Sequence, residues 1–392
     1  MKDSLQAIEL EKKFSRDKTY LLSKNGFFLF RFANGVFGSK WCGIWDLDKK
    51  LIEYFAFKVG GVWLSPLNFK RFVYDGVQAL HEYEIEMGKI VEKVCLDEGS
   101  VMVELRTPKK VEIEVEVGVN IRKRCENVHR RTYTLVSGED RVRVMNEIGV
   151  VEIGVEKGNF IPEPRREVHF PGLYAIEQGY DFRWYEEMQE KFIPGIFRFR
   201  GKRMVLWIGK KKKFGKVLKK KKEEIRKKAK IGWALASSLI SFYFEREYAG
   251  FFAGFPYFNQ FWTRDFLWMF RPLLIAGFER EAGKALKTIA ENQLKDGSIR
   301  MIIEEEKSCA DSTPLFLLSV YYYIKFAKNP FPLESVKRAI DYGVENYEDG
   351  LIFHDPKLTW MDSLHREYAI EIQSLWAKSF ELWGSILKLS LI

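Results

Sequence analysis

The chain has 392 residues, more than one hydrophobic core usually serves, so we expect two domains. Aromatic residues make up 15% of the sequence and charged residues 30%, and the absence of a Gly-, Pro- or Ser-rich tract excludes disorder over most of the length. No run of about 18 apolar residues occurs and the N-terminus carries mixed charges, so we expect neither a membrane partner nor a signal peptide, and we expect a cytoplasmic protein.

The first half of the sequence alternates apolar and polar residues with a period of two. The alternation predicts half-buried strands and is strict in three segments, Val111–Val117, Arg141–Val144 and Phe197–Arg200. Turn residues at Gly99–Ser100 and Ser137–Asp140 separate such runs, and no helical crossover intervenes. We therefore expect antiparallel sheets stacked as a β-sandwich domain over residues 1–209.

A basic run at residues 210–230 follows the predicted strands. It holds 13 basic residues against Glu223 and Glu224, a local charge of +11 within a net charge of +10, so the rest of the chain is near −1. We interpret the run as a solvated linker and the start of a helix. A nucleic-acid partner is not expected, because no recognisable reading module accompanies the basic stripe.

The second half, residues 231–392, shows the 3.6-residue period of helices. One apolar stripe runs from Phe278 to Leu294 and ends at Asp296-Gly297, a typical helix C-terminus. Thr313-Pro314 opens another helix. About six helices are predicted in all, over 225–246, 264–277, 278–294, 313–326, 333–347 and 370–388.

Successive helices with short connections suggest antiparallel hairpins, which either stack as a solenoid or close into a ring. The sequence has no fixed repeat of the lengths typical of solenoids, which disfavours that arrangement. Cysteines and histidines are scattered without metal-ligand spacing, so neither a metal, a cofactor nor a disulfide framework is predicted. Abundant Glu, Lys and Arg beside few His and Cys is typical of thermophile proteins.

Polar and aromatic residues gather in three loops that precede predicted helices, at Ala253–Asp265, Cys309–Pro314 and Thr359–Asp362 with Ile370–Gln373. Sugars offer apolar faces that stack on Trp and Tyr, and hydroxyls that carboxylates and Arg can hold. Cleavage of a glycosidic bond needs one carboxyl to protonate the leaving oxygen and a second to serve a water or attack carbon. Loops of this composition therefore suit a carbohydrate.

Each acid in these loops also has a plainer interpretation. Arg264 and Asp265 could form an ordinary ion pair at a helix end, and Asp311 could be a helix N-cap. Asp362 could cap a turn, and Glu371 could sit in the first turn of the last helix, where the helix dipole favours an acid. Taken singly, none of the four acids shows whether it serves a carbohydrate site or has only this structural role.

Taken in order, the segments resemble the C-terminal domain of glycogen debranching enzymes, the amylo-α-1,6-glucosidase family related to glucoamylases. That family reads GYPWF with WGRD, VDAT, TWMDA and VEIQALW. This chain has Gly254-Phe-Pro-Tyr-Phe258 with Trp262-Thr-Arg-Asp265, Ala310-Asp-Ser-Thr-Pro314, Thr359-Trp-Met-Asp-Ser363 and Ile370-Glu-Ile-Gln-Ser-Leu-Trp376. The first half is more loosely similar to that family's N-terminal β-sandwich, around Tyr20–Gly26.

The resemblance implies an (α/α)6 toroid whose active site lies in the loops leading into the inner helices. Asp362 would be the general acid of an inverting hydrolysis. Arg264 and Asp265 would grip glucose hydroxyls, and the remaining pocket residues would be Asp311, Trp360, Glu371, Trp262 and Tyr257. The substrate would be an α-glucan such as glycogen, limit dextrin or a maltooligosaccharide, and no metal or cofactor is implied.

The sequence departs from the family in two ways. Thr263 replaces the glycine of WGRD and adds bulk to a tight loop, and Ser363 replaces an alanine. The chain also provides about six of the twelve helices that the ring needs, and no glutamate after Glu381 could supply the family's general base. We therefore expect an incomplete toroid over 231–392, which a second polypeptide could complete.

Three functions stay open on the sequence alone. The first is the debranching-type glucosidase, with a glucoamylase-type α-1,4 exo-hydrolase as a variant of it. The second is a non-catalytic α-glucan-binding protein, for which Asp362 would be dispensable. The third is a basic interaction protein that uses residues 210–230 on an acidic polymer, and its binding would fall steeply with salt.

Overall fold

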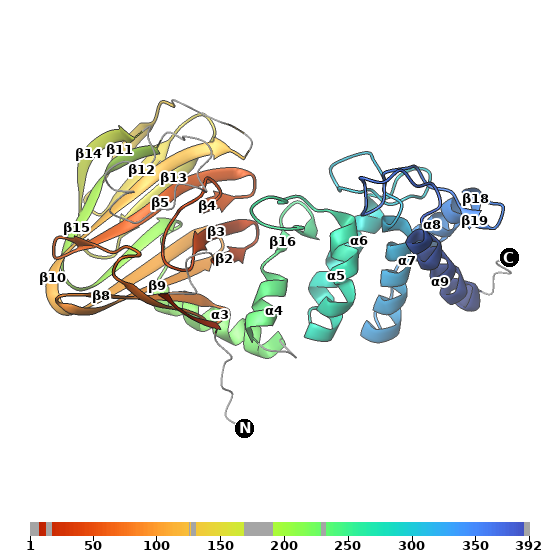
Figure 1. Cartoon of the computed structure of the whole chain (residues 1–392), viewed down its shortest axis with the longest axis horizontal. Helices are drawn as coiled ribbons and strands as arrows, with labels where there is room; N and C mark the ends of the chain where they lie inside the picture. The colour runs from red at the N-terminus through yellow and green to blue at the C-terminus, as the bar shows by residue number, and fades with distance from the viewer. Residues whose placement is uncertain are drawn as a thin grey trace, which may run out of the picture. The chain divides into compact units, whose positions relative to one another are not determined.

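The structure is a computed structural model that forms two compact units. One unit holds the first fifteen strands with helices α3 and α4, and the other holds the chain from Phe242 onward (Figure 1). The structure describes residues 8–12, 18–124, 126, 131–167, 191–228 and 233–387, with backbone alone at 224–228 and 233–235.

The first unit is built from antiparallel strands, as the period-two alternation predicts. The described strands are β1 (Ile8–Glu11), β2 (Thr19–Lys24), β3 (Phe27–Phe32), β4 (Gly43–Asp46), β5 (Lys49–Val59), β6 (Val62–Trp63), β7 (Phe69–Tyr74), β8 (Gln78–Ile85), β9 (Gly88–Asp97), β10 (Ser100–Lys123), β11 (Thr134–Ser137), β12 (Arg141–Met145), β13 (Val150–Val155), β14 (Asn159–Glu167) and β15 (Lys191–Gly209). The predicted turns join β9 to β10 and β11 to β12.

These strands form one connected ladder, where the sequence predicts separate stacked sheets. The reason is the length of β10, which has 24 residues and changes its partner along the way. Its first stretch pairs with β9, and after the irregularity between Arg106 and Val111 its second stretch pairs with β5. Strand β15 pairs with β10 on its other side from Ser100 to Val119, so the two long strands carry the sheet around one large hydrophobic cluster.

The basic run forms helix α3 (Phe214–Lys228), which lies against the strands of its own unit. Phe214 and Val217 are buried against a small cluster that includes Trp207 of β15. The lysines around them face acids, with Lys211 3.1 Å from Asp140, Lys212 2.6 Å from Asp97 and Lys222 3.6 Å from Asp75. Part of the local positive charge is therefore paired with acids of the same unit.

The helix predicted over 225–246 is wrong. Helix α3 begins at Phe214, a second helix α4 spans Trp233–Ile240, and strand β16 takes Tyr243–Glu245. Apolar residues at 214, 217 and 218 give the lysine run an amphipathic face, a spacing that the density of lysines conceals.

The second unit confirms the other predicted helices. Its elements are β16 (Tyr243–Glu245), β17 (Ala249–Phe251), α5 (Thr263–Ala276), α6 (Glu279–Glu291), α7 (Ser312–Tyr322), the π-helical turn η2 (Tyr323–Ala327), α8 (Leu333–Glu345), β18 (Tyr347–Glu348), β19 (Leu351–Ile352) and α9 (Ile370–Leu387). No described helix is long and apolar enough to cross a membrane.

Helix α7 lies at the centre of this unit, between α5 and α9, while α6 packs on α5 and α7 and α8 packs on α7. Two hydrogen bonds fix α9 to α7: the Trp383 indole donates to the Leu317 carbonyl at 2.9 Å, and the Ser379 hydroxyl donates to the Pro314 carbonyl at 3.1 Å. The segments that connect the helices gather at one end of α5 and α7 (Figure 1). That end carries the three loops identified in the sequence.

Candidate functional site

The loop before α5 presents aromatic side chains. Backbone hydrogen bonds between Gly254 and Phe258 close its tip, where the side chain of Tyr257 is 50% exposed. The Phe258 ring packs edge-on against Trp262, with ring centroids 6.1 Å apart. The indole nitrogen of Trp262 is buried, and no described residue accepts its hydrogen bond. A buried donor without an acceptor is costly unless a ligand or water fills the gap.

Thr263 fits its tight position because it is the first residue of α5 and its hydroxyl is satisfied. The Oγ1 atom donates to the Arg300 carbonyl at 2.5 Å and lies 2.8 Å from the Ser312 hydroxyl at the start of α7. The side chain is fully buried. The hydroxyl that a glycine would lack therefore joins the N-terminal ends of α5 and α7.

Arg264 and Asp265 have different environments although they are adjacent. The Arg264 guanidinium lies 3.5 Å from a carboxylate oxygen of Asp311, so it links the loops before α5 and α7. Asp265 is exposed to solvent. The interpretation of Arg264 and Asp265 as a mutual helix-end ion pair is not supported, because Arg264 pairs with the acid of the neighbouring helix.

Asp311 is 1% exposed, and neither of its carboxylate oxygens has a donor in hydrogen-bond geometry among the described residues. It occupies the N-cap position of α7 but makes no capping hydrogen bond, so the N-cap interpretation is wrong. Burial raises the pKa of Asp311, and the nearby Arg264 offsets this only in part. The site thus holds an acid whose charge the described protein does not fully compensate.

The loop before α9 is joined to the loop before α7 by a backbone hydrogen bond of 3.0 Å from Ala310 N–H to the Leu358 carbonyl. It exposes Trp360, whose surface is 57% accessible, and Asp362, which is also exposed. Asp362 forms neither an ion pair nor a side-chain hydrogen bond within the described ranges, so its carboxyl is accessible to a ligand.

His354 closes the base of this loop. Its ring Nε2 accepts the Ala369 N–H at 3.0 Å, which leaves Nδ1 as the protonated nitrogen that donates to the Asp355 carbonyl at 3.1 Å. The side chain is buried, and its backbone N–H also donates to the Glu367 carbonyl at 3.1 Å. The neutral imidazole therefore holds together the two ends of the segment that carries Trp360 and Asp362.

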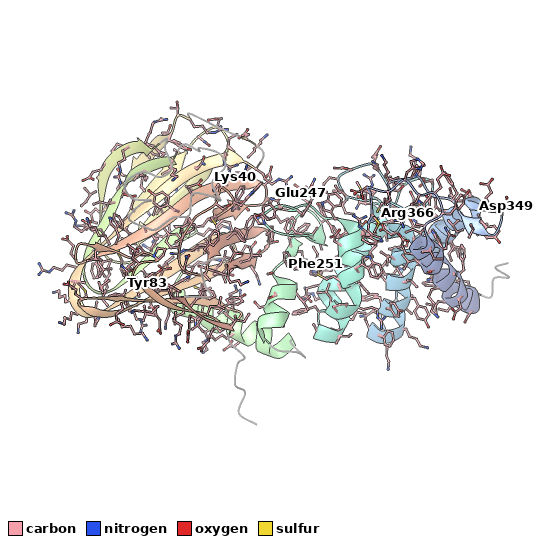
Figure 2. The ribbon with its side chains drawn as sticks, viewed as in Figure 1. Lys40, Tyr83, Glu247, Phe251, Asp349 and Arg366 are labelled. Carbon is pink, nitrogen blue, oxygen red and sulfur yellow. The ribbon has the colours of Figure 1, made fainter. Side chains whose placement is uncertain are left out.

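Arg366 connects this loop to α9. Its guanidinium lies 2.7 Å from one carboxylate oxygen of Glu371 and donates to the other at 3.1 Å, and it also donates to the Thr359 hydroxyl at 2.8 Å. Figure 2 shows Arg366 among the side chains of these loops. Burial alone would raise the pKa of Glu371, but the hydrogen bond and the positive charge of Arg366 outweigh it and lower the pKa.

The structure places the predicted residues in the loops before α5, α7 and α9 and joins only some of them by direct contacts. Arg264 contacts Asp311, and Glu371 contacts Arg366, a residue that the sequence did not predict. Asp362, Asp265 and Tyr257 lie on the same loops and are exposed. Chemically, the set offers a compensating cation, a buried acid, exposed acids and exposed aromatic faces, which are the groups that bind and protonate a sugar.

Sequence reasoning missed Arg366, His354 and the structural part played by Ser312. Arg366 lies five residues before Glu371, outside the quoted motifs, and only the turn of the loop brings its guanidinium back to the acid. His354 belongs to no motif and to no pair of histidines, so the sequence offers no reason to select it. Arg366 and His354 both hold the loop before α9 in shape by contacts between its ends, and the periodicity of the sequence does not predict such contacts.

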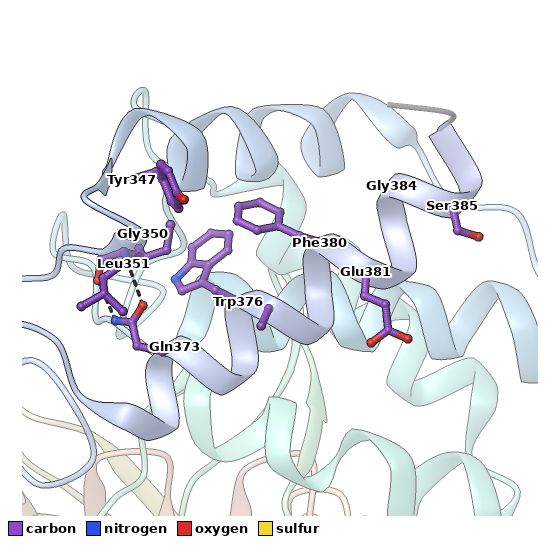
Figure 3. Close-up of a pocket in the computed structure, with 11 residues that line it drawn as sticks. Tyr347, Gly350, Leu351, Gln373, Trp376, Phe380, Glu381, Gly384 and Ser385 are labelled. Atoms are coloured by element: carbon purple, nitrogen blue, oxygen red, sulfur yellow. Dashed lines mark hydrogen bonds between the residues drawn. The ribbon is translucent and has the colours of Figure 1, made fainter. Parts of the chain in front are cut away.

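A groove of about 610 Å³ runs along another face of α9 (Figure 3). Its lining includes Tyr347, Trp376 and Phe380 but none of the predicted substrate or catalytic residues. The Gln373 amide, drawn in the same view, donates to and accepts from the backbone of Ile352 at 2.8 Å each. Gln373 therefore anchors β19 to α9, and the groove is separate from the candidate site.

No family model matches the sequence, and no curated protein matches it. Among solved structures, the chain is similar to a bacterial glucoamylase complexed with acarbose, with a TM-score of 0.56 and 10% identity over 94% of this chain and 66% of that one. It is also similar to a putative kojibiose phosphorylase from the human microbiome, with a TM-score of 0.60 and 10% identity over 97% of this chain and 65% of that one.

The chain thus spans slightly less than two thirds of the length of either structure. At this identity the likeness concerns the fold, which is the one that these carbohydrate-processing enzymes share. The β-rich unit and the helical unit together belong to a glycoside-hydrolase-like fold.

Proposed function

We propose that this chain is the first part of an amylo-α-1,6-glucosidase of the glycogen debranching type, which binds α-glucan in the loops before α5, α7 and α9. The observation that carries the proposal is the pair of unsatisfied buried groups in those loops, the Asp311 carboxylate and the Trp262 indole N–H. A sugar hydroxyl both accepts and donates hydrogen bonds, so it matches either group. The four ordered motifs and the fold shared with a glucoamylase support the same choice.

In this proposal Asp362 is the general acid. Its carboxyl gives a proton to the glycosidic oxygen as the bond to the anomeric carbon breaks, and a water attacks that carbon from the opposite face, which inverts the configuration. Arg264 and Asp265 hold hydroxyls of the glucose, while Trp360 and Tyr257 offer stacking surfaces. The exposure and free carboxyl of Asp362 suit this role.

The base that activates the water is not assigned to this chain. Helices α5 to α9 supply part of the (α/α)6 toroid that we propose, and a second polypeptide would supply the remaining helices together with the general base. In an inverting pair, the two carboxyls stand roughly 6.5 to 9.5 Å apart across the bond. The chain alone is therefore expected to bind α-glucan better than it hydrolyses it.

Two assays test the proposal. The first measures glucose release from a branched limit dextrin by the wild-type chain and by D362N. The second measures maltooligosaccharide binding by both proteins. We expect binding by both and weak or absent hydrolysis that D362N abolishes. Hydrolysis that survives in D362N would contradict the assignment of Asp362.

The same assays separate the alternatives. A non-catalytic α-glucan-binding protein would bind without hydrolysis even when helices that complete the ring are supplied. A glucoamylase-type exo-hydrolase would release glucose from linear maltooligosaccharides as readily as from limit dextrin. The α-1,6 preference therefore rests on the comparison of branched with linear substrate.

A further inference from the structure

Three buried side chains form an ordered chain of hydrogen bonds between the starts of α5 and α7. The Thr263 hydroxyl donates to the Arg300 carbonyl at 2.5 Å, and this contact uses its one proton because a carbonyl can only accept. Thr263 therefore accepts from the Ser312 hydroxyl at 2.8 Å, and Ser312 accepts from the Cys309 thiol at 2.9 Å. Burial raises the pKa of that thiol, which keeps its proton. The chain thus runs in one direction, from Cys309 to Arg300.

A stretch of backbone between α6 and α7 ties the same two helix starts a second time. The Thr263 N–H donates to the Met301 carbonyl at 3.0 Å, and the Thr313 hydroxyl accepts the Ile299 N–H at 3.0 Å. Both helix starts are therefore anchored to one short segment, in addition to the direct contact between Thr263 and Ser312. Because protein interiors are close-packed, these contacts leave the spacing between the two helix starts little freedom.

Arg264 and Asp311 adjoin this chain in the sequence, since one follows Thr263 and the other precedes Ser312. The Arg264 Nη1 atom lies 3.5 Å from the Asp311 Oδ2 atom, and neither Asp311 oxygen has a hydrogen-bond donor among the described residues. A guanidinium that is free to approach a carboxylate closes to a fork at about 2.7 to 2.9 Å. The anchored helix starts therefore keep this pair apart, which leaves the buried carboxylate open to a third partner.

We propose that Thr263 and Ser312 are positioning residues, whose hydroxyls set the distance across which a sugar hydroxyl bridges two charged groups. These groups are the Arg264 guanidinium, from which the sugar hydroxyl accepts, and the Asp311 carboxylate, to which it donates. A closed fork between the two groups would have to open before a sugar could bind, and holding them apart in advance spares that cost. The functional part of this inference rests on the α-glucan site proposed above.

The first test concerns the protein without sugar. Carbon-13 NMR of protein labelled at the Asp carboxyl carbons follows the titration of Asp311, whose signal is the one that D311N removes. T263V keeps a branched side chain at position 263 but lacks the hydroxyl. We expect Asp311 to titrate at lower pH in T263V than in the wild type, because the released Arg264 closes onto the carboxylate. An unchanged titration, or a shift to higher pH, would overturn the proposal.

Two further variants show whether the hydroxyl itself is responsible. T263S keeps the hydroxyl and should titrate as the wild type does, whereas a T263S protein that titrates like T263V would contradict the proposal. S312A removes the next member of the chain, so it should shift the titration of Asp311 in the same direction as T263V. S312A also supplies the test if T263V does not fold.

T288V is the matched control for the loss of a buried threonine hydroxyl. Thr288 is buried in α6, and its hydroxyl donates to the Lys284 carbonyl of its own helix at 3.3 Å. T288V should leave the titration of Asp311 unchanged. A shift as large as that of T263V would mean that any lost buried hydroxyl has this effect, and would contradict the positioning role.

The second test is a double-mutant cycle on maltotriose affinity with T263V, D311N and the double variant. We expect T263V to weaken binding roughly tenfold when Asp311 is present and by less than about twofold in the D311N background. Losses that multiply in the double variant would mean that Thr263 acts independently of Asp311, and would overturn the proposal. If the wild-type chain binds no α-glucan, the proposed function fails, and the titration still decides whether Thr263 sets the spacing.

Discussion

At Asp311 a carboxylate is buried beside Arg264, yet the described residues provide neither oxygen with a donor in hydrogen-bond geometry. The sequence pattern there, an acid directly before Ser-Thr-Pro, is that of a helix N-cap. The side chain makes no capping hydrogen bond, and its carboxylate lies 3.5 Å from the Arg264 guanidinium instead. An acid kept in such a place is costly to stability, and a bound sugar would recover that cost.

We expect the free energy of unfolding to depend on pH because of the buried Asp311. Because the pKa of Asp311 is raised in the folded state, the folded chain binds more protons than the unfolded chain between the unfolded and the folded pKa. The contribution of Asp311 to the free energy of unfolding therefore falls as pH rises through that window. D311N should remove this fall and raise the free energy of unfolding by about 1 kcal/mol at neutral pH.

Urea unfolding of the wild type and D311N, followed from acid to neutral pH, measures that difference. The curves should converge below the unfolded pKa, where the acid is protonated in both states. A D311N variant that is less stable at neutral pH would show instead that Arg264 compensates the charge. D362N, at an exposed acid on the neighbouring loop, is the control and should follow the wild type.

At the scale of elements, the helices of the second unit could be predicted because their apolar residues recur at the helical period. Helix α6 buries Ala282, Ala285, Leu286 and Ile289, which are members of the stripe seen in the sequence. Helix α3 could not, since three apolar positions among lysines give a weak signal. The continuity of the sheet also escapes the sequence, because it depends on distant partners such as β5 and β9 on β10.

The contact between α8 and α9 leads to a prediction about glycine. A Cβ added at Gly343 would lie 2.4 Å from the Trp376 ring, whereas one added at Gly215 in α3 would meet nothing within 4 Å. Alanine normally stabilises a helix interior by roughly 0.5 to 1 kcal/mol over glycine. We expect G215A to stabilise the protein slightly and G343A to destabilise it by about 1 to 3 kcal/mol.

Thermal unfolding with calorimetry checks both variants. G343A should lower the transition of the helical unit, because the buried Trp376 ring has to shift to admit the methyl group. If G343A were as stable as the wild type, the close packing of α8 on α9 would be incorrect.

At the scale of the whole molecule, the loops of the candidate site and the basic run belong to different units, so their contributions can be separated. Several lysines of the run already face acids on the strands of their own unit, which weakens the alternative of a polyanion-binding protein. The sequence could not show this, since the partners are Asp75, Asp97 and Asp140, far from the run in the chain.

Neutralising three exposed lysines of α3 tests that alternative. The K216Q/K219Q/K220Q variant should keep the α-glucan affinity of the wild type within about twofold, because a neutral sugar has no net charge for these lysines to attract. Affinity measured at low and high salt should also agree. A steep fall with salt, or a loss of binding in this variant, would favour the polyanion alternative.

The central claim is that the loops before α5, α7 and α9 form an α-glucan site. Isothermal titration of the whole chain with maltotriose, beside the same titration of W360A and D311N, tests it most directly. We expect measurable binding by the wild type and at least roughly tenfold weaker binding by each variant, as for loss of a sugar-stacking surface or a charged hydrogen-bond partner. Absence of binding by the wild type, or equal affinity in all three proteins, would contradict it.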